Sequence, residues 1–399
     1  MPVVIMFCGL TAAIDSTFAK TWTQSNAPTN DWASIASSAD GSKLAAVVDG
    51  GGIYTSTNSG VDWTLTSATN QYWSSIASSA DGNKLVAASS SIYTSTNAGA
   101  TWTLTQAPYL YWLSVASSSD GTKLAAVAAD PGGGLYTSTN SGVTWTLNFV
   151  PAPPPVPVLF SVASSADGTK LVVVGYQIFY STNSGASWTP TSTPILPAPV
   201  VAPSREIAVS ANGSKCVAFM GYDDIYGNPS PLYTSTNFGE TWTKTSVPSN
   251  QWMYVASSAD GTRLIAAAGA LTLSGPIYTS TDSGVTWTSN NVPYTNWSAV
   301  AISADGCKLV AGGSRGSGGP IFISYSPPAP QVSVASQNGN LALSWLVPST
   351  NFVLQQNLDL TTTNWVTLIN TPALNLTNLH DEVTLSPTNR SGFYRLIAQ

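Results

Sequence analysis

Charge is scarce in this sequence. Only 8% of its 399 residues are charged, against roughly 25% in an average soluble protein. The 13 basic and 19 acidic residues give a net charge of −6, which argues against a nucleic-acid partner because phosphate binding needs clustered Lys and Arg. Ser, Thr and Asn must supply most of the polar surface. The 43% of hydrophobic residues still predicts a packed globular chain.

Cysteine and histidine are nearly absent. The chain has three Cys and one His, His380. Cys216 and Cys307 lie too far apart in the repeat pattern described below to be expected to pair, and no CxxC motif or Cys/His cluster occurs. These absences exclude a structural zinc site, and they exclude a histidine general base from the main domain. We therefore predict no metal and no cofactor.

Long hydrophobic runs are also missing. No stretch of about 18 apolar residues follows the N-terminus, so no membrane span is expected. A short apolar run, Val3 to Ile14, precedes Thr17-Phe18-Ala19, which suits signal-peptidase cleavage. We interpret residues 1–19 as a signal segment and predict a secreted or cell-surface protein. No Lys or Arg precedes the run, so we expect the segment to start upstream; the alternative is a buried N-terminal strand.

An internal repeat dominates the rest of the chain. The segment Ile53 to Thr64 returns five more times with small changes, and an isolated Thr21-Trp22-Thr23 precedes the first copy. The spacing of 39 to 54 residues follows from the recurring tryptophans Trp63, Trp102, Trp145, Trp188, Trp242 and Trp287. This is the scale of one four-stranded propeller blade.

Each repeat divides into four short β-like runs separated by two turns. In one copy the runs are 73–78, 85–88, 92–95 and a last one that opens at 101–103, with turns at 80–83 and 96–99. In the first turn Asp81 can bond its own backbone and Gly82 can take a positive φ. The spacing and the alternation together predict β-strands.

The two ends of the repeat region complement each other. The seventh copy begins at Trp297 and stops after Ile321 to Ser324, without a final strand. Pairing it with the orphan Thr21-Trp22-Thr23 completes the blade and removes an exposed sheet edge. The predicted fold is all-β: a seven-bladed β-propeller closed by an N-terminal outer strand, followed by a small C-terminal β-sandwich.

The second turn carries a family resemblance. Ser280-Thr281-Asp282-Ser283-Gly284-Val285-Thr286-Trp287 matches the Asp-box, Ser-x-Asp-x-Gly-x-Thr-Trp, and the other copies carry Asn in the Asp position. Over residues 21–324 the chain resembles Asp-box (BNR repeat) propellers of the sialidase-like fold superfamily. The resemblance implies that the box is a structural hairpin away from any active site, with its Trp packed between blades. Sialidases also use three Arg, and only Arg205 and Arg315 map to the expected ligand face, so sialidase activity is not expected.

A composition change marks the end of the propeller. Residues 325–330 read Tyr-Ser-Pro-Pro-Ala-Pro, a linker. Six short β-like runs follow, at 331–335, 341–346, 352–356, 365–369, 383–385 and 393–397. They resemble the fibronectin-III-like modules of secreted bacterial proteins. We divide the chain into a signal segment (1–19), a propeller (20–326) and a β-sandwich (327–399).

The ligand face is expected where the inner strands begin, here called the top face, because both Asp-type turns then fall on the bottom. Five inner strands start with Trp: Trp32, Trp73, Trp112, Trp252 and Trp297. These rings either stack on sugars, together with nearby Tyr72, Tyr109, Tyr111 and Tyr294, or plug the gaps between blades. We favour the plug and leave the sugar platform open.

The repeats lose their symmetry in one sector. Blades three to five carry the irregular segments 129–132, 151–157, 193–203 and 221–228, with Arg205 and Glu206 opening the fifth inner strand. We predict that a ligand contacts this sector, and the candidate binding residues are Trp112, Arg205, Tyr222, Asp223, Asp224 and Tyr226. Aromatic faces would stack, while carboxylates and Arg orient polar groups. Neutral variation of the loops is the alternative.

Catalytic residues are not identified. A glycosidase needs two carboxylates about 5–9 Å apart, and the acidic residues expected near the top face are Asp31, Asp49, Asp130, Glu206, Asp223 and Asp224. None lies in a recognisable motif, and the pattern indicates no oligomeric state. We interpret the protein as a binding or adhesion propeller for glycan or protein. The alternatives are a polysaccharide hydrolase or lyase, and a scaffold or assembly factor like the single Asp-box propeller of photosystem II assembly.

Overall fold

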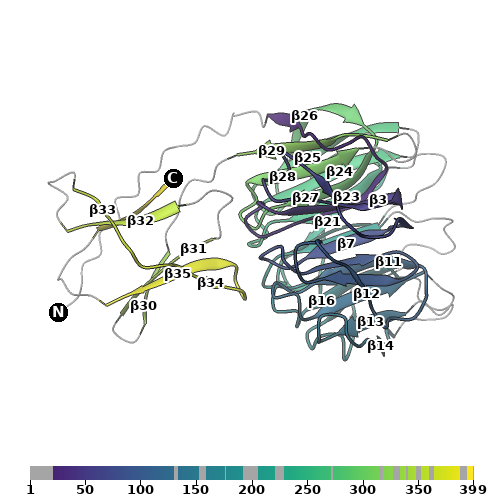
Figure 1. The fold of residues 1–399 in the computed structure, drawn as a ribbon, viewed down its shortest axis with the longest axis horizontal. Coiled ribbons are helices and arrows are strands. Elements are labelled where there is room, and N and C mark those ends of the chain that lie inside the picture. Colours follow the sequence, from purple (N-terminus) through teal and green to yellow (C-terminus); the bar gives the residue numbers. More distant parts are fainter. Residues whose placement is uncertain are drawn as a thin grey trace.

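A computed structural model describes residues 21–129, 134–151, 159–175, 177–191, 205–220, 229–270, 273–313, 318–326, 333–337, 340–346, 352–358, 364–386 and 393–398. All regular structure in these residues is β-strand (Figure 1). Within the same ranges no helix is long and apolar enough to cross a membrane. The signal segment predicted at 1–19 lies outside the described residues.

Antiparallel sheets follow one another along residues 32–325, and consecutive strands in each sheet pair with their neighbours. Their strands are β2 (Trp32–Ser37), β3 (Leu44–Gly51), β4 (Ile53–Ser56) and β5 (Thr64–Leu65), with β6 (Gln71–Tyr72) pairing β3; β7 (Ser75–Ser78), β8 (Leu85–Ala88), β9 (Ile92–Ser95) and β10 (Thr103–Leu104); β11 (Trp112–Ser117), β12 (Leu124–Ala128), β13 (Leu135–Ser138) and β14 (Thr146–Asn148); and β15 (Leu159–Ser164), β16 (Leu171–Gly175), β17 (Ile178–Ser181) and β18 (Thr189–Pro190).

The series continues with three further sheets. Their strands are β19 (Arg205–Val209), β20 (Cys216–Met220), β21 (Leu232–Ser235) and β22 (Thr243–Lys244); β23 (Trp252–Ser257), β24 (Leu264–Ala270), β25 (Leu273–Ser280) and β26 (Thr288–Thr295); and β27 (Trp297–Ile302), β28 (Lys308–Gly313) and β29 (Ile321–Tyr325), the last joined by β1 (Trp22–Gln24). In β1, Trp22 lies opposite Ser324 of β29 in an antiparallel pair. The first and last strands of this region therefore share one sheet.

The first strands of successive sheets pack side by side, and β27 also contacts β2. In the first turns, which follow these inner strands, main-chain hydrogen bonds of 2.7–2.8 Å join neighbouring sheets. The backbone N–H of each residue donates to the carbonyl of the following one in the series Ala39, Ala80, Ser119, Ala166, Ala211, Ala259 and Ala304. The N–H of Ala304 donates in turn to the carbonyl of Ala39. This arrangement of four-stranded antiparallel sheets is that of a β-propeller.

The core lies between neighbouring sheets. The second strands are buried along their length, as in β8 and β12, because their small and β-branched residues face neighbours on both sides. The tryptophans that open the inner strands fill the spaces beside them. Trp32, for example, packs edge-on against Tyr54 at 5.4 Å between ring centroids, and Trp73 packs on Tyr93 in the same way. The plug interpretation agrees with this packing.

Both predicted turns form their side-chain hydrogen bonds. In the first turn the Asn83 N–H donates to Asp81 Oδ1 at 3.0 Å, and Gly82 has φ +69°. In the second, the Asp62 N–H donates to Asn58 Oδ1 at 2.9 Å, and Trp63 Nε1 donates to the Gly60 carbonyl at 3.0 Å. These side chains are committed to the turns, which explains why Asn serves as well as Asp.

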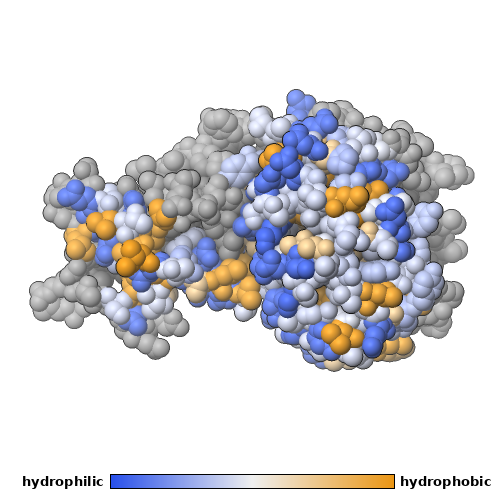
Figure 2. Space-filling model, viewed as in Figure 1, coloured by the Kyte–Doolittle hydropathy of each residue, from blue (hydrophilic) through white to orange (hydrophobic). Residues whose placement is uncertain are grey.

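The C-terminal residues form two small sheets. One holds β30 (Ser333–Gln337), β31 (Asn340–Leu346), β35 (His380–Leu385) and β34 (Ala373–Asn375), and the other holds β33 (Val366–Thr367), β32 (Phe352–Asn357) and β36 (Phe393–Ala398). Leu343, Trp345, Leu354 and Val383 pack between them. The hairpin of β34 and β35 reaches the propeller (Figure 1), where Leu379 packs with Ala39 and Ala304 and the Ser119 hydroxyl donates to the Leu376 carbonyl at 2.6 Å. Figure 2 shows hydrophilic and hydrophobic residues interspersed over the described surface on this side.

Candidate functional site

A cavity of about 370 Å³ lies at the centre of the propeller, between the inner strands. Its base is a collar of β-branched residues, one from each inner strand: Ile35, Ile76, Val115, Val162, Ile207, Val255 and Val300. A cavity of about 150 Å³ already takes benzene, so this one is large enough for a small ligand. A second cavity of about 180 Å³ lies among the later residues of the same strands, and Leu379 is part of its lining.

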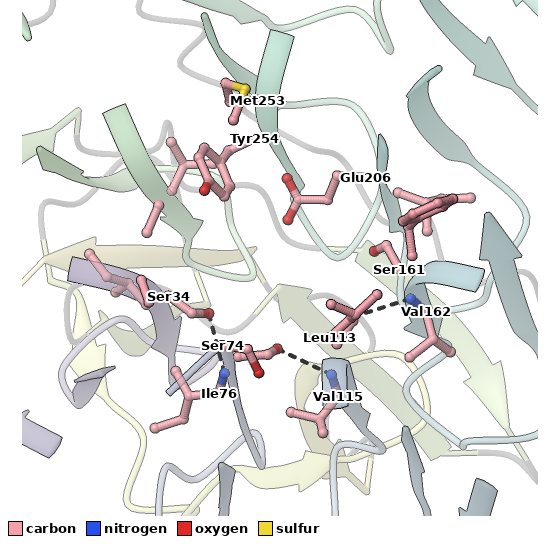
Figure 3. A pocket seen from close by; sticks show the side chains of 18 residues that line it. Ser34, Ser74, Ile76, Leu113, Val115, Ser161, Val162, Glu206, Met253 and Tyr254 are labelled. Carbon is pink, nitrogen blue, oxygen red and sulfur yellow. Dashed lines mark hydrogen bonds between the residues drawn. The ribbon is translucent and has the colours of Figure 1, made fainter. Parts of the chain in front are cut away.

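The residue just before each of these collar residues, here called the wall position, forms the wall of the central cavity. In four neighbouring strands this residue is serine: Ser34, Ser75, Ser114 and Ser161. The N–H of Ile76 donates to Ser34 Oγ at 3.2 Å, and the N–H of Val115 donates to Ser75 Oγ at 3.1 Å (Figure 3). The serines thereby join one sheet to the next through a side chain. Their hydroxyl hydrogens remain available as donors, because each oxygen acts as the acceptor in these bonds.

The other side of the wall breaks this pattern. The wall position holds Glu206, Tyr254 and Ala299 in the three remaining strands. The N–H of Val255 donates to Glu206 Oε2 at 3.0 Å, so the carboxyl takes over the acceptor function of a serine. Figure 3 shows the carboxyl group pointing into the cavity, with Tyr254 to one side and Ser161 to the other.

In the backbone pairing Glu206 is equivalent to the serines. It lies opposite Phe219 on β20, as Ser34 lies opposite Val47 on β3 and Ser75 lies opposite Ala88 on β8. The carboxyl therefore stands where the neighbouring inner strands present a hydroxyl group.

Burial governs the electrostatics of Glu206. It raises the pKa of the Glu206 carboxyl to about 8, and the hydrogen bond from the Val255 N–H opposes this only in part. A carboxyl with such a pKa is mainly protonated at neutral pH. Burial also raises the pKa of the Cys216 thiol, on the adjacent strand, to about 12, so this cysteine is not a thiolate nucleophile. Cys216 and Cys307 are both buried and form no disulfide with each other.

The predicted binding residues fall in different places. Trp112 is 0% exposed, and its ring packs on Tyr136 at 5.2 Å between centroids; its Nε1 has no hydrogen-bond partner among the described residues. In this structure Trp112 packs between strands with its ring covered. Arg205 opens β19, but its side chain lies outside the described part of the chain, as do Tyr222, Asp223, Asp224 and Tyr226.

Exposed tyrosines lie near the same end of the propeller as the cavity. Tyr72, Tyr109 and Tyr111 are 78%, 79% and 59% exposed. The backbone of Tyr72 pairs with that of Asp49 on β3. Asp49 directly follows Val48, which pairs with Trp32 at the start of β2. The Tyr111 carbonyl accepts from the Ala129 N–H, next to the start of β11. The structure thus places these rings on the top face. The side chain of Tyr294 is outside the described set.

On the bottom face, lysines join neighbouring sheets. Lys43 Nζ donates to the Asp81 carbonyl at 3.0 Å, Lys123 Nζ to the Asp167 carbonyl at 2.9 Å, and Lys170 Nζ to the Asn212 carbonyl at 2.8 Å. Some of the few positively charged side chains therefore form hydrogen bonds between neighbouring sheets. This favours the top face as the ligand face.

Glu206 is one of the acidic residues predicted near the top face, but it is not among the predicted binding residues. The wall positions of the seven inner strands read Ser, Ser, Ser, Ser, Glu, Tyr and Ala in chain order. The single carboxylate in a run of small polar residues is the signal that would have found it. Within the described residues no three His, Cys, Asp or Glu side chains come together to hold a metal ion.

Solved structures of β-propeller proteins resemble this chain. A GH74 xyloglucanase from Xanthomonas campestris matches with TM-score 0.57 and 15% identity, over 88% of this chain and 60% of that one. YCF48 from Cyanidioschyzon merolae matches with TM-score 0.53 and 16% identity, over 76% of this chain and 98% of that one. A structure of YCF48 bound to D1 peptide matches with TM-score 0.53 and 14% identity, over 78% and 96%.

These similarities concern the fold. The chain spans about 60% of the length of the xyloglucanase it matches, and all three identities are between 14% and 16%. No protein-family model and no curated protein sequence matches the chain. The comparisons therefore agree with the geometry above: the protein has a β-propeller fold.

Proposed function

We propose that this protein is a non-catalytic, carbohydrate-binding propeller, and that its ligand approaches the top face over the central cavity. The observation that carries the proposal is the position of Tyr72, Tyr109 and Tyr111, which are largely exposed at the end of the propeller where the serine-walled cavity lies. Flat aromatic faces stack on sugar rings, and hydroxyl donors suit sugar oxygens.

The proposed architecture has seven Asp-box blades over residues 20–326, closed by β1, with a fibronectin-III-like β-sandwich over residues 327–399. The pairing of β1 with β29 supports closure. The main-chain hydrogen bonds that return from Ala304 to Ala39 support it too. A short apolar N-terminal run and the low charge support action outside the cell.

A binding function fits the cavity better than hydrolysis does. A glycosidase places two carboxyl groups about 5–9 Å apart across its substrate. Among the described residues that line the central cavity, Glu206 is the one acid. Asp40, Asp81, Asp120 and Asp167 are engaged in the bottom turns, where each accepts from a serine hydroxyl and a backbone N–H.

A glycan-array screen of the purified protein tests the proposal, together with an assay for the release of reducing sugar. We expect retention of one class of glycan without release. The double change Tyr72→Ala with Tyr111→Ala should weaken retention at least tenfold and leave the melting temperature within a few degrees, since both rings are exposed. Tyr325→Ala is the matched control, because Tyr325 is 37% exposed and lies opposite Lys308 at the other end of the sheets.

Three outcomes would contradict the proposal. Release of reducing sugar would favour the hydrolase alternative. Retention that is unaffected by the tyrosine changes but lost in the control would move the site to the bottom face. Absence of any glycan ligand, with capture of a defined peptide instead, would favour the assembly-factor alternative.

A further inference from the structure

The fold does not require a carboxylate at position 206. The structural role of the residue is to accept one hydrogen bond from the next inner strand, and Ser34, Ser75 and Ser114 do this at 3.1–3.2 Å. Glu206 accepts the same bond from Val255 at 3.0 Å. A glutamate adds a second oxygen and an ionisable group, and Figure 3 shows both oxygens on the cavity side of the strand.

Among the described residues, Glu206 has no positively charged partner. Its inner strand is flanked by β15, which has no titratable residue, and by β23, which contributes Tyr254. On β20, which pairs with β19, the titratable group is the Cys216 thiol. Arg205 precedes Glu206 on β19, with its side chain outside the described residues. The raised pKa of Glu206, caused by burial, agrees with a carboxyl that has no strong cationic contact.

A single buried carboxyl suits a monovalent organic cation. Divalent metal ions take several oxygen ligands, and no cluster of three such side chains occurs in the described part of the protein. An ammonium group carries one charge and three N–H donors. The rings of Phe160 and Tyr254 line the same cavity, and aromatic faces attract a nearby cation.

The serine side of the cavity favours a ligand with oxygen acceptors. Ser34, Ser75 and Ser114 use their oxygens as acceptors for backbone N–H groups, which leaves each O–H group available as a donor. An alkyl chain, such as the stem of a lysine, would leave these donors unsatisfied at a cost. A compact molecule with an ammonium group on one side and hydroxyl or ring oxygens on the other satisfies both sides.

We propose that the central cavity binds a hydroxylated primary amine of the amino-sugar class, with its ammonium group against Glu206 and its oxygens against the serine hydroxyls. This deepens the proposed carbohydrate-binding function and rests on it. Binding is coupled to the release of one proton from the carboxyl group. The protonated carboxyl loses its proton to the solvent, the carboxylate pairs with the ammonium ion, and no covalent bond between protein and ligand forms.

Calorimetric titration of the full chain at pH 6.5 tests the inference, with D-glucosamine, D-glucose, N-acetyl-D-glucosamine and Nα-acetyl-lysine amide as probes. Two buffers with different heats of ionisation count the protons released. We expect glucosamine to bind at least tenfold more tightly than glucose or N-acetylglucosamine and to release close to one proton. The neutral sugars should release none.

The variant Glu206→Gln keeps the shape and the acceptor for the Val255 N–H but removes the charge. We expect it to lower glucosamine affinity at least tenfold, to abolish proton release and to leave glucose affinity within twofold. Glu206→Ser, which copies the sister strands, should behave in the same way. Thermal melting of both variants shows whether they fold, and Ser75→Ala should weaken glucose and glucosamine alike.

The outcomes separate the two proposals. If glucose binds and glucosamine shows no advantage, or if Glu206→Gln leaves glucosamine affinity unchanged, the amino-sugar inference is overturned while carbohydrate binding stands. Tighter binding of Nα-acetyl-lysine amide than of glucosamine overturns it in favour of a peptide ammonium group. If none of these sugars binds to the wild-type protein, the amino-sugar inference is overturned, and the glycan-array screen decides separately whether carbohydrate binding stands.

Discussion

The backbone N–H of Ala304 donates a 2.7 Å hydrogen bond to the carbonyl of Ala39. These residues lie in corresponding first turns of the last and first repeats, near opposite ends of the propeller sequence. Only a chain that returns to its beginning brings them together. The pairing of Trp22 with Ser324 joins the same two ends at the outer side of the last sheet. Stability should therefore depend on a few N-terminal residues.

Removal of residues 1–25 should lower the melting temperature substantially, because β29 would become an unpaired edge and the packing of Trp22 would be lost. Trp22→Ala alone should cost less than the ~3–5 kcal/mol of a fully buried Trp, since Trp22 is only partly buried. Urea denaturation measures both, with exposed Gln24→Ala as control. A truncated protein that melts within a degree or two of full length would contradict the role of β1.

Gly142→Val should destabilise the protein by more than about 2 kcal/mol. Gly142 has φ +87°, and a Cβ there would meet Thr94 Cγ2 at 3.0 Å. Ser141→Ala should be milder, because Ser141 already carries a Cβ at φ +57°. Ser141→Gly relieves that conformation and should be neutral or slightly stabilising. Chemical denaturation ranks the three variants, and equal, negligible effects would show that the turn tolerates any residue.

Stability should fall as the pH rises from about 5 to 8. The folded-state pKa of Glu206 is raised to about 8 by burial, so over this range the folded protein holds a proton that the unfolded chain releases. The expected loss is on the order of 5 kcal/mol at most, and it levels off above pH 8. Glu206→Gln should remove this dependence and be the more stable protein at pH 8.5.

The turn aspartates serve as an internal contrast to Glu206. Burial raises the pKa values of Asp81, Asp120 and Asp167, but hydrogen bonds from serine hydroxyls and backbone N–H groups lower them further, and the net pKa values are below the ordinary range. Their contribution to stability is present above the ordinary Asp pKa and is lost only at lower pH. Urea midpoints measured from pH 5 to 9 that are identical for wild type and Glu206→Gln would contradict the burial of an isolated carboxyl.

Leu379→Asp should separate the C-terminal sheets from the propeller. The Leu379 side chain packs with Ala39 and Ala304. Its backbone has φ +56°, a conformation that residues with apolar side chains seldom adopt. A charge there would be buried without a partner, so the contact should open. Small-angle scattering should report a larger radius of gyration, while the propeller melts as before. Ser119→Ala, which removes the hydroxyl that donates to the carbonyls of Leu376 and Ala166, should have a smaller effect on scattering. Unchanged scattering for Leu379→Asp would show that the contact is not maintained in solution.

Local sequence patterns predicted much of the propeller. The Asp-Gly turns and the small inner strands appear near the expected residues, because their hydrogen bonds and side-chain periodicity lie within a few residues of one another. The outer strand of the second sheet begins at Thr103, slightly later than expected. The C-terminal sheets include β34, which was not predicted. Short strands have little periodicity, so their ends depend on the partner strand.

The candidate site was less accessible to such reasoning. Five of the six predicted binding residues have side chains outside the described part of the chain, and the sixth, Trp112, is buried. An aromatic ring at the start of a strand has the same sequence signature whether it faces solvent or a neighbouring sheet. The packing of Trp112 on Tyr136 decides between them, and that contact joins residues of different strands.

The sequence by itself determined the repeat, its strands and its two turns, since these depend on residues close together in the chain. It also contained the exception at Glu206 among the serines of the same position. Only the tertiary structure decided that this position faces a central cavity, and that Ser34, Ser75 and Ser114 share the cavity wall with Glu206. The physical reason is convergence: one residue from each distant repeat meets the others around a common axis, and the burial created there sets the protonation of the carboxyl.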